Sequence, residues 1–353
     1  MQRRSTALQL AILTYLFLFA NPLFAEDVII MKNGDRMTGS IKSLNSGVLY
    51  VSLDYVDGNL SVEWSKVARV ESTQSFLVRT DDGSVYTGKL ATVETPSQGA
   101  ASVRVVPSEG EAVEIDQSRI VRVGPTSERF WQRFNGAINT GIAYSKGNQS
   151  TQFNVGADAE YPRPRWAAYT SLNSNLTTSS GTNASTRNQF NFTPQHLLPW
   201  NNWYYAGLAA YLQSSVQGIS SQTTFGGGIG HFLTNSNRSK ISALAGLGWQ
   251  STHYQHSITA QPTQNDATGV LAGQLKFFKF KKTNGTLTAV LLPALSEPGR
   301  VRLNLNSSYY LKIFGNLSWN ASFYGNFDHK PPTTFAGSDY GSTSGFSWTF
   351  GNR

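Results

Sequence analysis

The chain has 353 residues, enough for more than one domain. Charged residues make up 14% of it, well below the roughly 25% of an average soluble protein. There are 32 glycines, and 12% of the residues are aromatic. The mean hydropathy of −0.29 excludes a bundle of membrane-spanning helices. This composition is typical of a membrane β-barrel, whose strands alternate apolar with small polar residues.

The chain contains no cysteine, which excludes a thiol enzyme, a metal–thiolate site and any disulfide framework. The formal net charge of +8 is unevenly distributed. Residues 26–128 carry 15 acidic and 10 basic side chains, whereas residues 129–353 carry 6 acidic and 17 basic ones. A basic chain often indicates a nucleic-acid partner. The export signal described next argues against one, so we expect no nucleic acid.

The first 25 residues have the organisation of a secretory signal peptide. Arg3 and Arg4 form a positively charged start, and an apolar run follows at residues 11–20. Ala25 supplies a small residue for cleavage. We therefore predict a signal peptide over residues 1–25 and export from the cytoplasm. An uncleaved membrane anchor is the alternative.

A repeat of about 50 residues follows the signal peptide. Residues 28–41 (VIIMKNGDRMTGSI) resemble residues 76–90 (FLVRTDDGSVYTGKL) at an offset of 49 residues. The matching positions are Gly34, Thr38 and Gly39 in the first copy and Gly83, Thr87 and Gly88 in the second. The Asn-Gly and Asp-Gly pairs predict hairpin turns, and the Thr-Gly pairs predict bulges or sharp bends. We expect two small SH3-like or Sm-like β-barrel repeats, at residues 26–74 and 75–125.

From Trp131 onward the sequence alternates apolar and polar residues over segments of about ten residues. Twelve such segments are predicted, close to residues 130–145, 151–161, 165–177, 186–198, 203–213, 222–233, 239–252, 267–280, 285–294, 300–312, 316–327 and 339–350. Their lengths and even number favour an all-β fold with a C-terminal antiparallel transmembrane β-barrel over residues 130–353. Ile142 and Leu247 are predicted to face lipid, and Asn139 to face the lumen. A secreted soluble β protein is the alternative.

The connections between these segments predict the orientation of the barrel. Every second connection is short, such as 162–164 and 313–315, whereas most of the others are longer, such as 253–266. Outer-membrane barrels have short periplasmic turns and longer outer loops. Both barrel ends, and with them the N-terminal domain, are therefore expected in the periplasm of a Gram-negative bacterium.

The opening of the predicted barrel resembles a known family. Residues 131–147 (WQRFNGAINTGIAYSKG) lead through Gly147-Asn148 into a second strand. In this motif, and in the alternation of apolar and polar residues that continues to the end of the chain, the sequence resembles the salt-induced outer-membrane proteins. This family is defined by a domain of unknown function. The resemblance implies an outer-membrane barrel and no established activity.

No catalytic residue, metal site or cofactor-binding motif is predicted, so we expect no enzyme and no cofactor. His231 and Ser251 are the one pair that invites comparison with an outer-membrane hydrolase, and no spacing singles them out. We expect a non-enzymatic envelope barrel, either a narrow pore or a stress-related structural protein. The alternatives are a membrane-anchored periplasmic binding module, formed by residues 26–128, and a hydrolase.

Three kinds of partner are expected: outer-membrane lipid, the barrel-assembly machinery during biogenesis, and a periplasmic ligand of residues 26–128. Basic residues near the predicted periplasmic rim are expected either to hold the acidic N-terminal domain or to meet lipid headgroups. These residues are Arg163, Arg165, Arg238, Lys240, Lys279, Lys281, Lys282 and Lys312.

Overall fold

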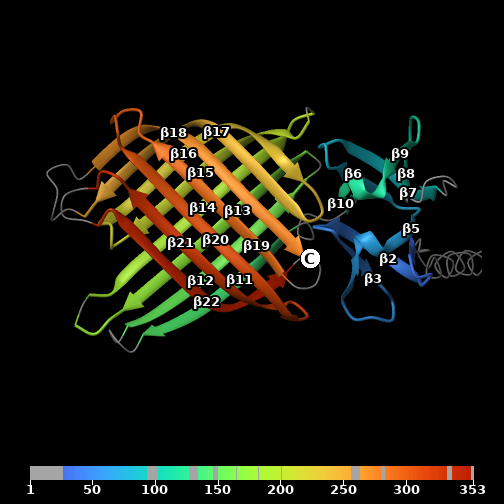
Figure 1. The fold of residues 1–353 in the computed structure, drawn as a ribbon, viewed down its shortest axis with the longest axis horizontal. Helices are drawn as coiled ribbons and strands as arrows, with labels where there is room; N and C mark the ends of the chain where they lie inside the picture. The colour runs from blue at the N-terminus through green and yellow to red at the C-terminus, as the bar shows by residue number, and fades with distance from the viewer. Residues whose placement is uncertain are drawn as a thin grey trace, which may run out of the picture.

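The protein consists of a long β-barrel and a smaller β domain that lies against one of its ends (Figure 1). The computed structural model describes residues 27–93, 102–126, 134–145, 150–163, 165–181, 183–199, 201–255, 263–279, 283–331 and 336–350. The predicted signal peptide lies outside these residues. Among them, no helix is long and apolar enough to cross a bilayer.

The N-terminal domain contains two copies of the same succession of elements. Each copy has five strands, with a 3-10 helix between its fourth and fifth strands. The first copy comprises β1 (Asp27–Met31), β2 (Arg36–Asn45), β3 (Val48–Ser52), β4 (Asn59–Glu63), η1 (Trp64–Lys66) and β5 (Val67–Glu71). The second comprises β6 (Ser75–Thr80), β7 (Val85–Val93), β8 (Ser102–Val106), β9 (Val113–Asp116), η2 (Gln117–Arg119) and β10 (Ile120–Pro125).

The two copies merge into one curved sheet in the order β4-β3-β2-β10-β6-β7-β8-β9, and β1 pairs with β2 and β5. Their apolar faces share one core, which includes Ile29 and Val78. The Trp64 indole donates to the Gln117 carbonyl oxygen at 2.9 Å, and the Gln117 amide donates back to Trp64. The expected boundary between the copies lies between β5 and β6, but the copies are packed as a single unit. The reason is that neither can bury its apolar face alone.

The repeated glycines have the same role in both copies. Gly34 and Gly83 adopt φ values of 90° and 86°, the left-handed conformation that a hairpin turn requires. At Gly39, a Cβ would lie 2.4 Å from the Ser52 carbonyl oxygen, and at Gly88 one would lie 2.4 Å from the Val106 carbonyl oxygen. The Thr-Gly pair thus allows the neighbouring strand to approach closely at the sharpest bend of each copy.

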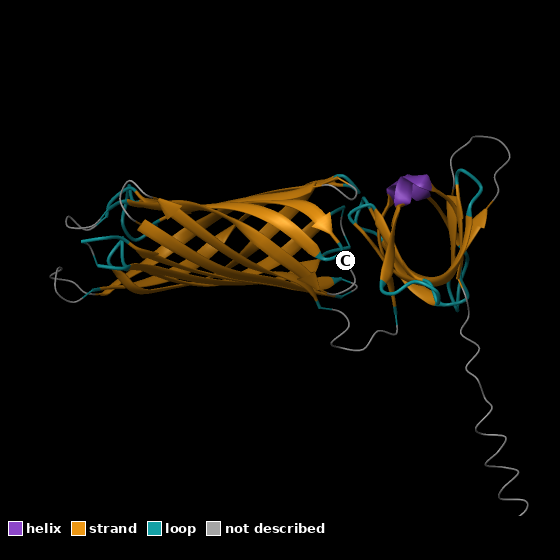
Figure 2. Ribbon diagram, turned by 90° about the horizontal axis from the view of Figure 1, so that it is seen from below, coloured by secondary structure: helices purple, strands orange, loops and turns teal. Residues whose placement is uncertain are grey.

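The C-terminal domain is a closed antiparallel barrel of twelve strands, as the sequence predicted. Figure 2 shows their tilt relative to the barrel axis. They are β11 (Asn135–Ser145), β12 (Ser150–Pro162), β13 (Trp166–Thr178), β14 (Ser185–Leu197), β15 (Trp203–Ser214), β16 (Ile219–Asn235), β17 (Ser239–Tyr254), β18 (Thr263–Lys279), β19 (Thr283–Pro293), β20 (Val301–Phe314), β21 (Leu317–Asp328) and β22 (Ser338–Phe350). The first strand pairs with the last, from Gly136 opposite Phe350 to Gly141 opposite Gly345, so the ladder has no free edge.

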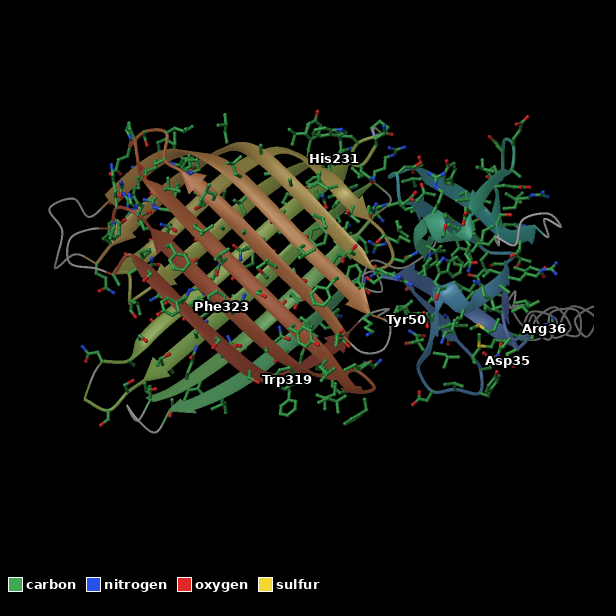
Figure 3. The ribbon with its side chains drawn as sticks, in the orientation of Figure 1. Asp35, Arg36, Tyr50, His231, Trp319 and Phe323 are labelled. Carbon is green, nitrogen blue, oxygen red and sulfur yellow. The ribbon has the colours of Figure 1, made fainter. Side chains whose placement is uncertain are left out.

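Side chains alternate between the two faces of the barrel wall along each strand. Ile142 and Leu247 point outward and are 65% and 67% exposed, whereas Gln250 and Thr252 point inward and are buried. Phe323 and Trp319 lie on the same outward face of β21, Trp319 nearer the N-terminal domain (Figure 3). The apolar outer face and polar inner face are the arrangement of an outer-membrane-type barrel.

Aromatic side chains surround the barrel end next to the N-terminal domain. Trp166, Trp203, Tyr205 and Phe314 are exposed there, as expected of an interfacial girdle. Tyr204, by contrast, is buried inside the barrel against Leu197 and Phe232, because its side chain is on the inward face of β15.

Heat resistance tests the closed ladder. In mild detergent the full chain should keep its β-sheet circular dichroism well above the melting range of ordinary soluble domains, because every strand is paired on both sides. Unboiled samples should migrate as a separate band on gels. A single band, combined with loss of β signal near 60 °C, roughly where mesophilic domains melt, would contradict closure.

The assignment of faces is tested by Ile142→Arg and Leu247→Arg. Each places a guanidinium in hydrocarbon, which costs roughly 2–4 kcal/mol near the bilayer midplane, so the yield of folded barrel should fall. Asn139→Ser, on the lumen face, is the control and should assemble normally. Gly246 is unsuitable as a control, because a Cβ there would lie 2.2 Å from the Gly227 carbonyl oxygen. Equal assembly of Ile142→Arg and Asn139→Ser would reverse the assignment.

Candidate functional site: the two ends of the lumen

An ion-pair cluster around Arg302 lies at the end of the lumen farthest from the N-terminal domain. This end is called the outer end, and the end next to the N-terminal domain is called the inner end. The buried Arg302 side chain, on β20, lies 3.0 Å from Asp266 of β18 and 3.2 Å from Asp328 of β21. Its guanidinium also donates to the Gln250 side-chain oxygen of β17. One residue therefore joins four strands, and its charge is balanced by two carboxylates in a water-poor setting.

Arg300 extends this outer cluster into the loop before β20. Its guanidinium lies 2.6 Å from Asp328 and 3.0 Å from Glu297, and it donates to the Tyr254 hydroxyl at 3.0 Å. The loop is fastened in turn to the next connection, because the Lys330 ammonium donates to the Pro298 carbonyl oxygen. The connection before β20 is thus held by Arg300 to Asp328 of β21 and by Lys330 to the connection that follows β21.

A second set of contacts crosses the lumen from β14 and β15 to β22. The Ser214 hydroxyl donates to Asp339 at 2.7 Å, and Arg187 lies 3.6 Å from the same carboxylate. The Arg187 guanidinium also stacks on the Tyr324 ring, 4.1 Å from its centroid. These contacts bridge opposite walls, which a lumen of twelve strands is narrow enough to allow.

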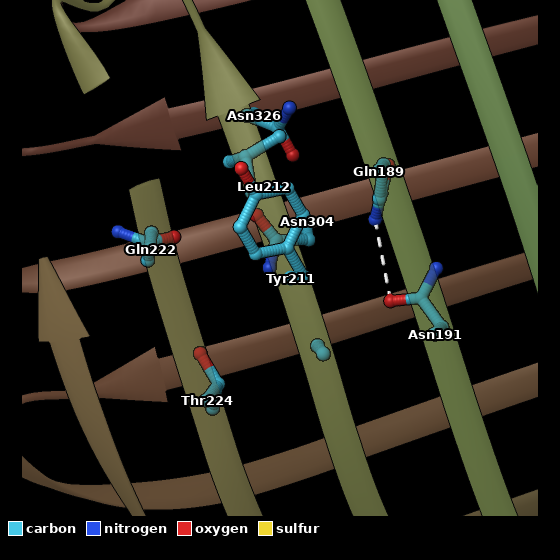
Figure 4. A pocket seen from close by; sticks show the side chains of 9 residues that line it. Gln189, Asn191, Tyr211, Leu212, Gln222, Thr224, Asn304 and Asn326 are labelled. Atoms are coloured by element: carbon cyan, nitrogen blue, oxygen red, sulfur yellow. Dashed lines mark hydrogen bonds between the residues drawn. The ribbon is translucent and has the colours of Figure 1, made fainter. Parts of the chain in front are cut away.

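Amide and hydroxyl side chains fill the lumen beside these bridges (Figure 4). The cavity left between them measures about 20 Å³, close to the space of one water molecule. Its polar lining consists of Gln189, Asn191, Gln222, Thr224, Asn304 and Asn326. At this level of the lumen, the described side chains of β14, β15, β16, β20 and β21 leave little space between them.

The inner end of the lumen is covered by the N-terminal domain. Three asparagines from the short turns of the barrel hold it. Asn202 and Asn235 donate to the Asp81 carbonyl oxygen at 2.6 and 3.3 Å, and Asn237 donates to the Ile120 carbonyl oxygen at 2.8 Å. These are neutral hydrogen bonds to the ends of β6 and β10, so the domain is placed with a defined register on the rim.

Two arginines of the N-terminal domain also contact the barrel. Arg122 lies 3.0 Å from Glu160 of β12, and the Arg79 guanidinium donates to the Arg163 carbonyl oxygen at 3.4 Å. Burial, and then the nearby charge of Arg122, lower the pKa of Arg79 to about 10. In this ion pair, Arg122 of the N-terminal domain supplies the base and Glu160 of the barrel supplies the acid. The sequence had suggested the opposite arrangement, with bases on the barrel rim and acids on the N-terminal domain.

The rim residues expected from the sequence do not form one patch. Lys240 faces the lumen, opposite Lys276 in the β17–β18 ladder. Arg163 and Arg165 flank the turn before β13, whereas Lys279 and Lys312 are exposed at the ends of β18 and β20. Lys281 and Lys282 lie outside the described residues.

Among the rim residues, Arg238 acts on an acidic residue of the N-terminal domain, Glu63. The pKa of the Glu63 carboxyl is lowered, chiefly by the hydrogen bond from Ser65 and to a smaller extent by the charges of Lys66 and Arg238. Arg238 is therefore near enough for its charge to act on Glu63, whose printed ion pair is with Lys66 of its own domain.

The charges of the barrel are sorted between its two ends. The sequence has six acidic residues after residue 129, and four of them belong to the outer clusters: Asp266, Glu297, Asp328 and Asp339. The other two, Asp158 and Glu160, lie on β12 toward the N-terminal domain. Ion pairs therefore span the outer end, whereas toward the inner end bases outnumber acids among the described residues of the barrel.

The two residues considered for a hydrolase are far apart. His231 pairs with Ala243, which lies eight residues before Ser251 along β17. At about 3.3 Å per residue, this separates them by roughly 26 Å. The His231 ring is instead 2.8 Å from the Asn201 carbonyl oxygen, near the inner end of the barrel.

Sequence reasoning missed most of the residues that close the lumen. Arg300, Asp328 and Asp339 lie near the ends of strands, where charges are ordinary. The asparagines of the inner turns look like common turn residues. The small number of acidic residues in the barrel could have pointed to these residues. A carboxylate inside a membrane barrel is expected to be paired with a base or to have a function.

The fold and the lumen define an outer-membrane-type β-barrel with a polar interior and a β domain against one of its ends. The chain belongs to the family described as "Protein of unknown function, DUF481", whose model matches residues 138–350. This match covers more than half of the chain and nearly all of the barrel. No curated protein matches the chain significantly.

Three solved structures have some similarity to this chain. The translocator domain of the autotransporter NalP from Neisseria meningitidis has 13% identity and a TM-score of 0.33, over 61% of this chain and 86% of that one. A porin refined at 1.8 Å has 10% identity and a TM-score of 0.29, over 92% and 99% of the two chains. A bacterial polysaccharide outer membrane secretin has 11% identity and a TM-score of 0.28, over 79% of this chain and 97% of that one. The fold assignment rests on the strand register described above.

The contacts of the N-terminal domain lead to a prediction about docking. Asn202→Ala combined with Asn237→Ala removes two interdomain hydrogen bonds, each worth about 0.5–1.5 kcal/mol, so the domain should leave the rim more often. Because the chain has no cysteine, spin labels can be placed at Ser108→Cys and Asn316→Cys. The distance distribution between them should broaden in the double variant.

Lys279→Ala combined with Lys312→Ala is the matched control, since it removes two exposed rim charges and no described interdomain contact. Raising the salt concentration should have less effect than the asparagine substitutions, because neutral hydrogen bonds are not screened. If the distance distribution changes with the lysine substitutions or with salt, but not with the asparagine substitutions, then charge attraction rather than neutral hydrogen bonding holds the domain on the rim.

Proposed function

We propose that this protein is a non-enzymatic barrel of the Gram-negative outer membrane that works as a narrow, normally closed pore, with its N-terminal domain covering the mouth in the periplasm. The observation that carries the proposal is the outer cluster. Arg300 and Arg302 close a polar lumen with charges drawn from loops and strands that belong to different hairpins. A purely structural barrel needs only a packed interior and gains nothing from charges placed at the mouth.

The cluster has the properties of a gate. Its members are ion pairs and hydrogen bonds between side chains, so they can separate without breaking the backbone ladder of the wall. The loop that carries Arg300 and Glu297 is held by these contacts, by Lys330, and by backbone hydrogen bonds from Ala294 and Leu295 near its start. Movement of that loop would withdraw Arg300 from Asp328 and open the outer half of the lumen. The small cavity between Gln189 and Asn304 would then be continuous with the outside.

The salt relation implied by the family resemblance fits this design. Ion pairs weaken as salt rises, although burial protects Arg302 more than the half-exposed Glu297. We therefore propose that high salt favours the open state through the loop contacts of Arg300. The same bilayer measurement, repeated at two salt concentrations, tests this part separately.

Conductance tests the gate. Arg302→Gln combined with Asp266→Asn keeps the lumen charge balanced and removes the central ion pair, so channel openings in planar bilayers should become at least several-fold more frequent than in the unaltered protein. The surplus of bases at the inner end should make the open state select anions, seen as an anion-directed reversal potential in a KCl gradient.

Arg104→Gln is the control, because Arg104 forms an exposed pair with Glu114 on the N-terminal domain, far from the lumen. It should leave the opening frequency unchanged. A double variant that folds into the heat-modifiable barrel yet never conducts would overturn the pore, and selectivity for cations would overturn the assigned role of the inner bases.

A second candidate function is supported by the ends of the N-terminal sheet. β4 and β9 lie at the two ends of the strand order, and among the described residues each pairs with one neighbour only. Such edges can accept a strand from another protein. A periplasmic protein that binds the full chain and loses binding on Ser61→Pro, in β4, would favour an adaptor role anchored by the barrel.

A further inference from the structure

A row of small residues crosses the outward face of the barrel wall near its inner end. Ala168 of β13 lies directly opposite Pro194 of β14, and Gly207 of β15 lies directly opposite Gly227 of β16. The two pairs are neighbours, because a Cβ on Gly207 would lie 3.1 Å from the Pro194 ring. Four adjacent strands therefore carry only small side chains, or none, along this row.

Three larger side chains stand beside the row, on the side nearer the inner end. Trp166, His196 and Tyr205 occupy directly opposite positions on β13, β14 and β15. Each is two residues away from the row along its strand, so all three share its outward face. They form one wall of an open groove of about 300 Å³, and the floor of this groove includes Pro194 and Gly207.

Pro194 interrupts the wall at the floor of the groove. The Leu198 amide donates to the Trp203 carbonyl oxygen of β15, and amides of the same parity along β14 point the same way. Proline has no amide hydrogen to donate in that direction, and the pairing of β14 with β15 skips Thr193 and Pro194. A proline inside a paired strand, facing a glycine, weakens the ladder. Such a departure from local stability indicates a function for the hollow that it creates.

The groove lies where lipid headgroups meet the barrel. Trp166 and Tyr205 are each 50% exposed and belong to the aromatic girdle of the inner end, and such girdles mark the boundary between hydrocarbon and headgroups. Arg165, an exposed base, directly precedes Trp166. Its carbonyl oxygen accepts a hydrogen bond from the Leu197 amide, next to His196. The groove therefore has an apolar floor on its hydrocarbon side and a cation with an imidazole on its headgroup side.

We propose that this groove holds one glycerophospholipid molecule, with an acyl chain over Pro194 and Gly207 and the phosphate group at Arg165 and His196. A guanidinium matches phosphate oxygens in charge and geometry, and an imidazole N–H can donate to another oxygen. The volume is at the lower end of the range for small-ligand sites, roughly 300–1,000 Å³. A flat wall lets lipid chains exchange freely, whereas a groove with aromatic walls retains one.

The lipid site lies on the outer wall of the barrel, so it goes beyond the proposed pore. It rests on the proposed function only for the membrane location and does not require conduction. The probe is phosphatidylglycerol, added in mixed micelles to the full chain after purification in detergent and removal of bound lipid. Native mass spectrometry then counts the lipid molecules that stay bound. One molecule per chain should remain at concentrations where all others have dissociated.

Gly207→Leu tests the floor of the groove. Its side chain would occupy the space of the acyl chain, so the retained lipid should be lost. Gly273→Leu is the matched control, because Gly273 is an exposed glycine of β18 where a Cβ would have nothing within 4 Å. The heat-modifiable band reports whether each variant folds. Trp166→Ala, which removes part of the wall without adding volume, should also release the lipid and serves if Gly207→Leu does not fold.

Arg165→Gln tests the headgroup end of the groove. It removes a charge-assisted hydrogen bond, so the Kd for phosphatidylglycerol should rise several-fold. Lys279→Gln removes another exposed base at the inner end, outside the groove, and should bind as the unaltered chain does. Diacylglycerol with the same acyl chains lacks the phosphate group and should bind about tenfold more weakly than phosphatidylglycerol.

Retention of one phosphatidylglycerol by the unaltered chain and by Gly273→Leu, with loss from Gly207→Leu or Trp166→Ala, supports the site. Absence of a retained lipid, equal retention in folded Gly207→Leu and Gly273→Leu, or equal affinity for diacylglycerol overturns it. Dimers that Gly207→Leu dissociates would also overturn it, because the groove would then be an interface between two copies of the chain. Failure of the pore would appear as absent conductance with lipid retention intact, so the two failures are distinguishable.

Discussion

The closed hydrogen-bond ladder of the barrel is the constraint on which the rest of the structure depends. A bilayer offers no water to an unpaired backbone group, so β11 and β22 must meet and every strand must have two neighbours. Closure fixes the parity of each side chain and leaves only two environments, hydrocarbon and lumen. Ile142 and Leu247 take the first, and Gln250 and Arg302 take the second. The placing of charge then follows from closure, because an ionised side chain on a strand avoids hydrocarbon only by facing the lumen or by lying at a strand end, as Lys279 and Lys312 do.

A lumen enclosed by twelve strands is narrow, and its side chains meet from opposite walls. Ser214 on β15 and Asp339 on β22 are in direct contact, although their strands are seven apart in one direction around the barrel and five in the other. Polar groups so confined must satisfy one another. The outer end achieves this by matching four carboxylates with arginines. The inner end keeps an excess of bases beneath the N-terminal domain. The barrel is thus polarised along its axis, sealed by ion pairs on one side and cationic on the other.

The N-terminal domain is attached by two kinds of interaction with different roles. Asn202, Asn235 and Asn237 give neutral, directional hydrogen bonds that set its position on the rim. Arg122 adds an ion pair with Glu160 of the barrel, and Arg79 adds a hydrogen bond to the Arg163 carbonyl oxygen. The merging of the two repeats into one sheet makes this possible, because the β2–β10 and β6–β10 pairings bring Arg122 and Arg79 to one surface.

The sequence by itself determined the repeat pair, the twelve strands and the faces of residues such as Ile142 and Leu247. Local patterns in the sequence predict these features. They are the period of two along a strand, the hairpin signals around Gly34 and Gly83, and the length of each connection. Only the tertiary structure decided that Arg302 meets Asp266, that Ser214 meets Asp339, and that Arg79 and Arg122 stand over Lys240 and Lys276. Such contacts depend on strand register, on closure of the barrel and on the docking of one domain on another. No local pattern encodes them, because residues far apart in the chain become neighbours only when the ladder closes.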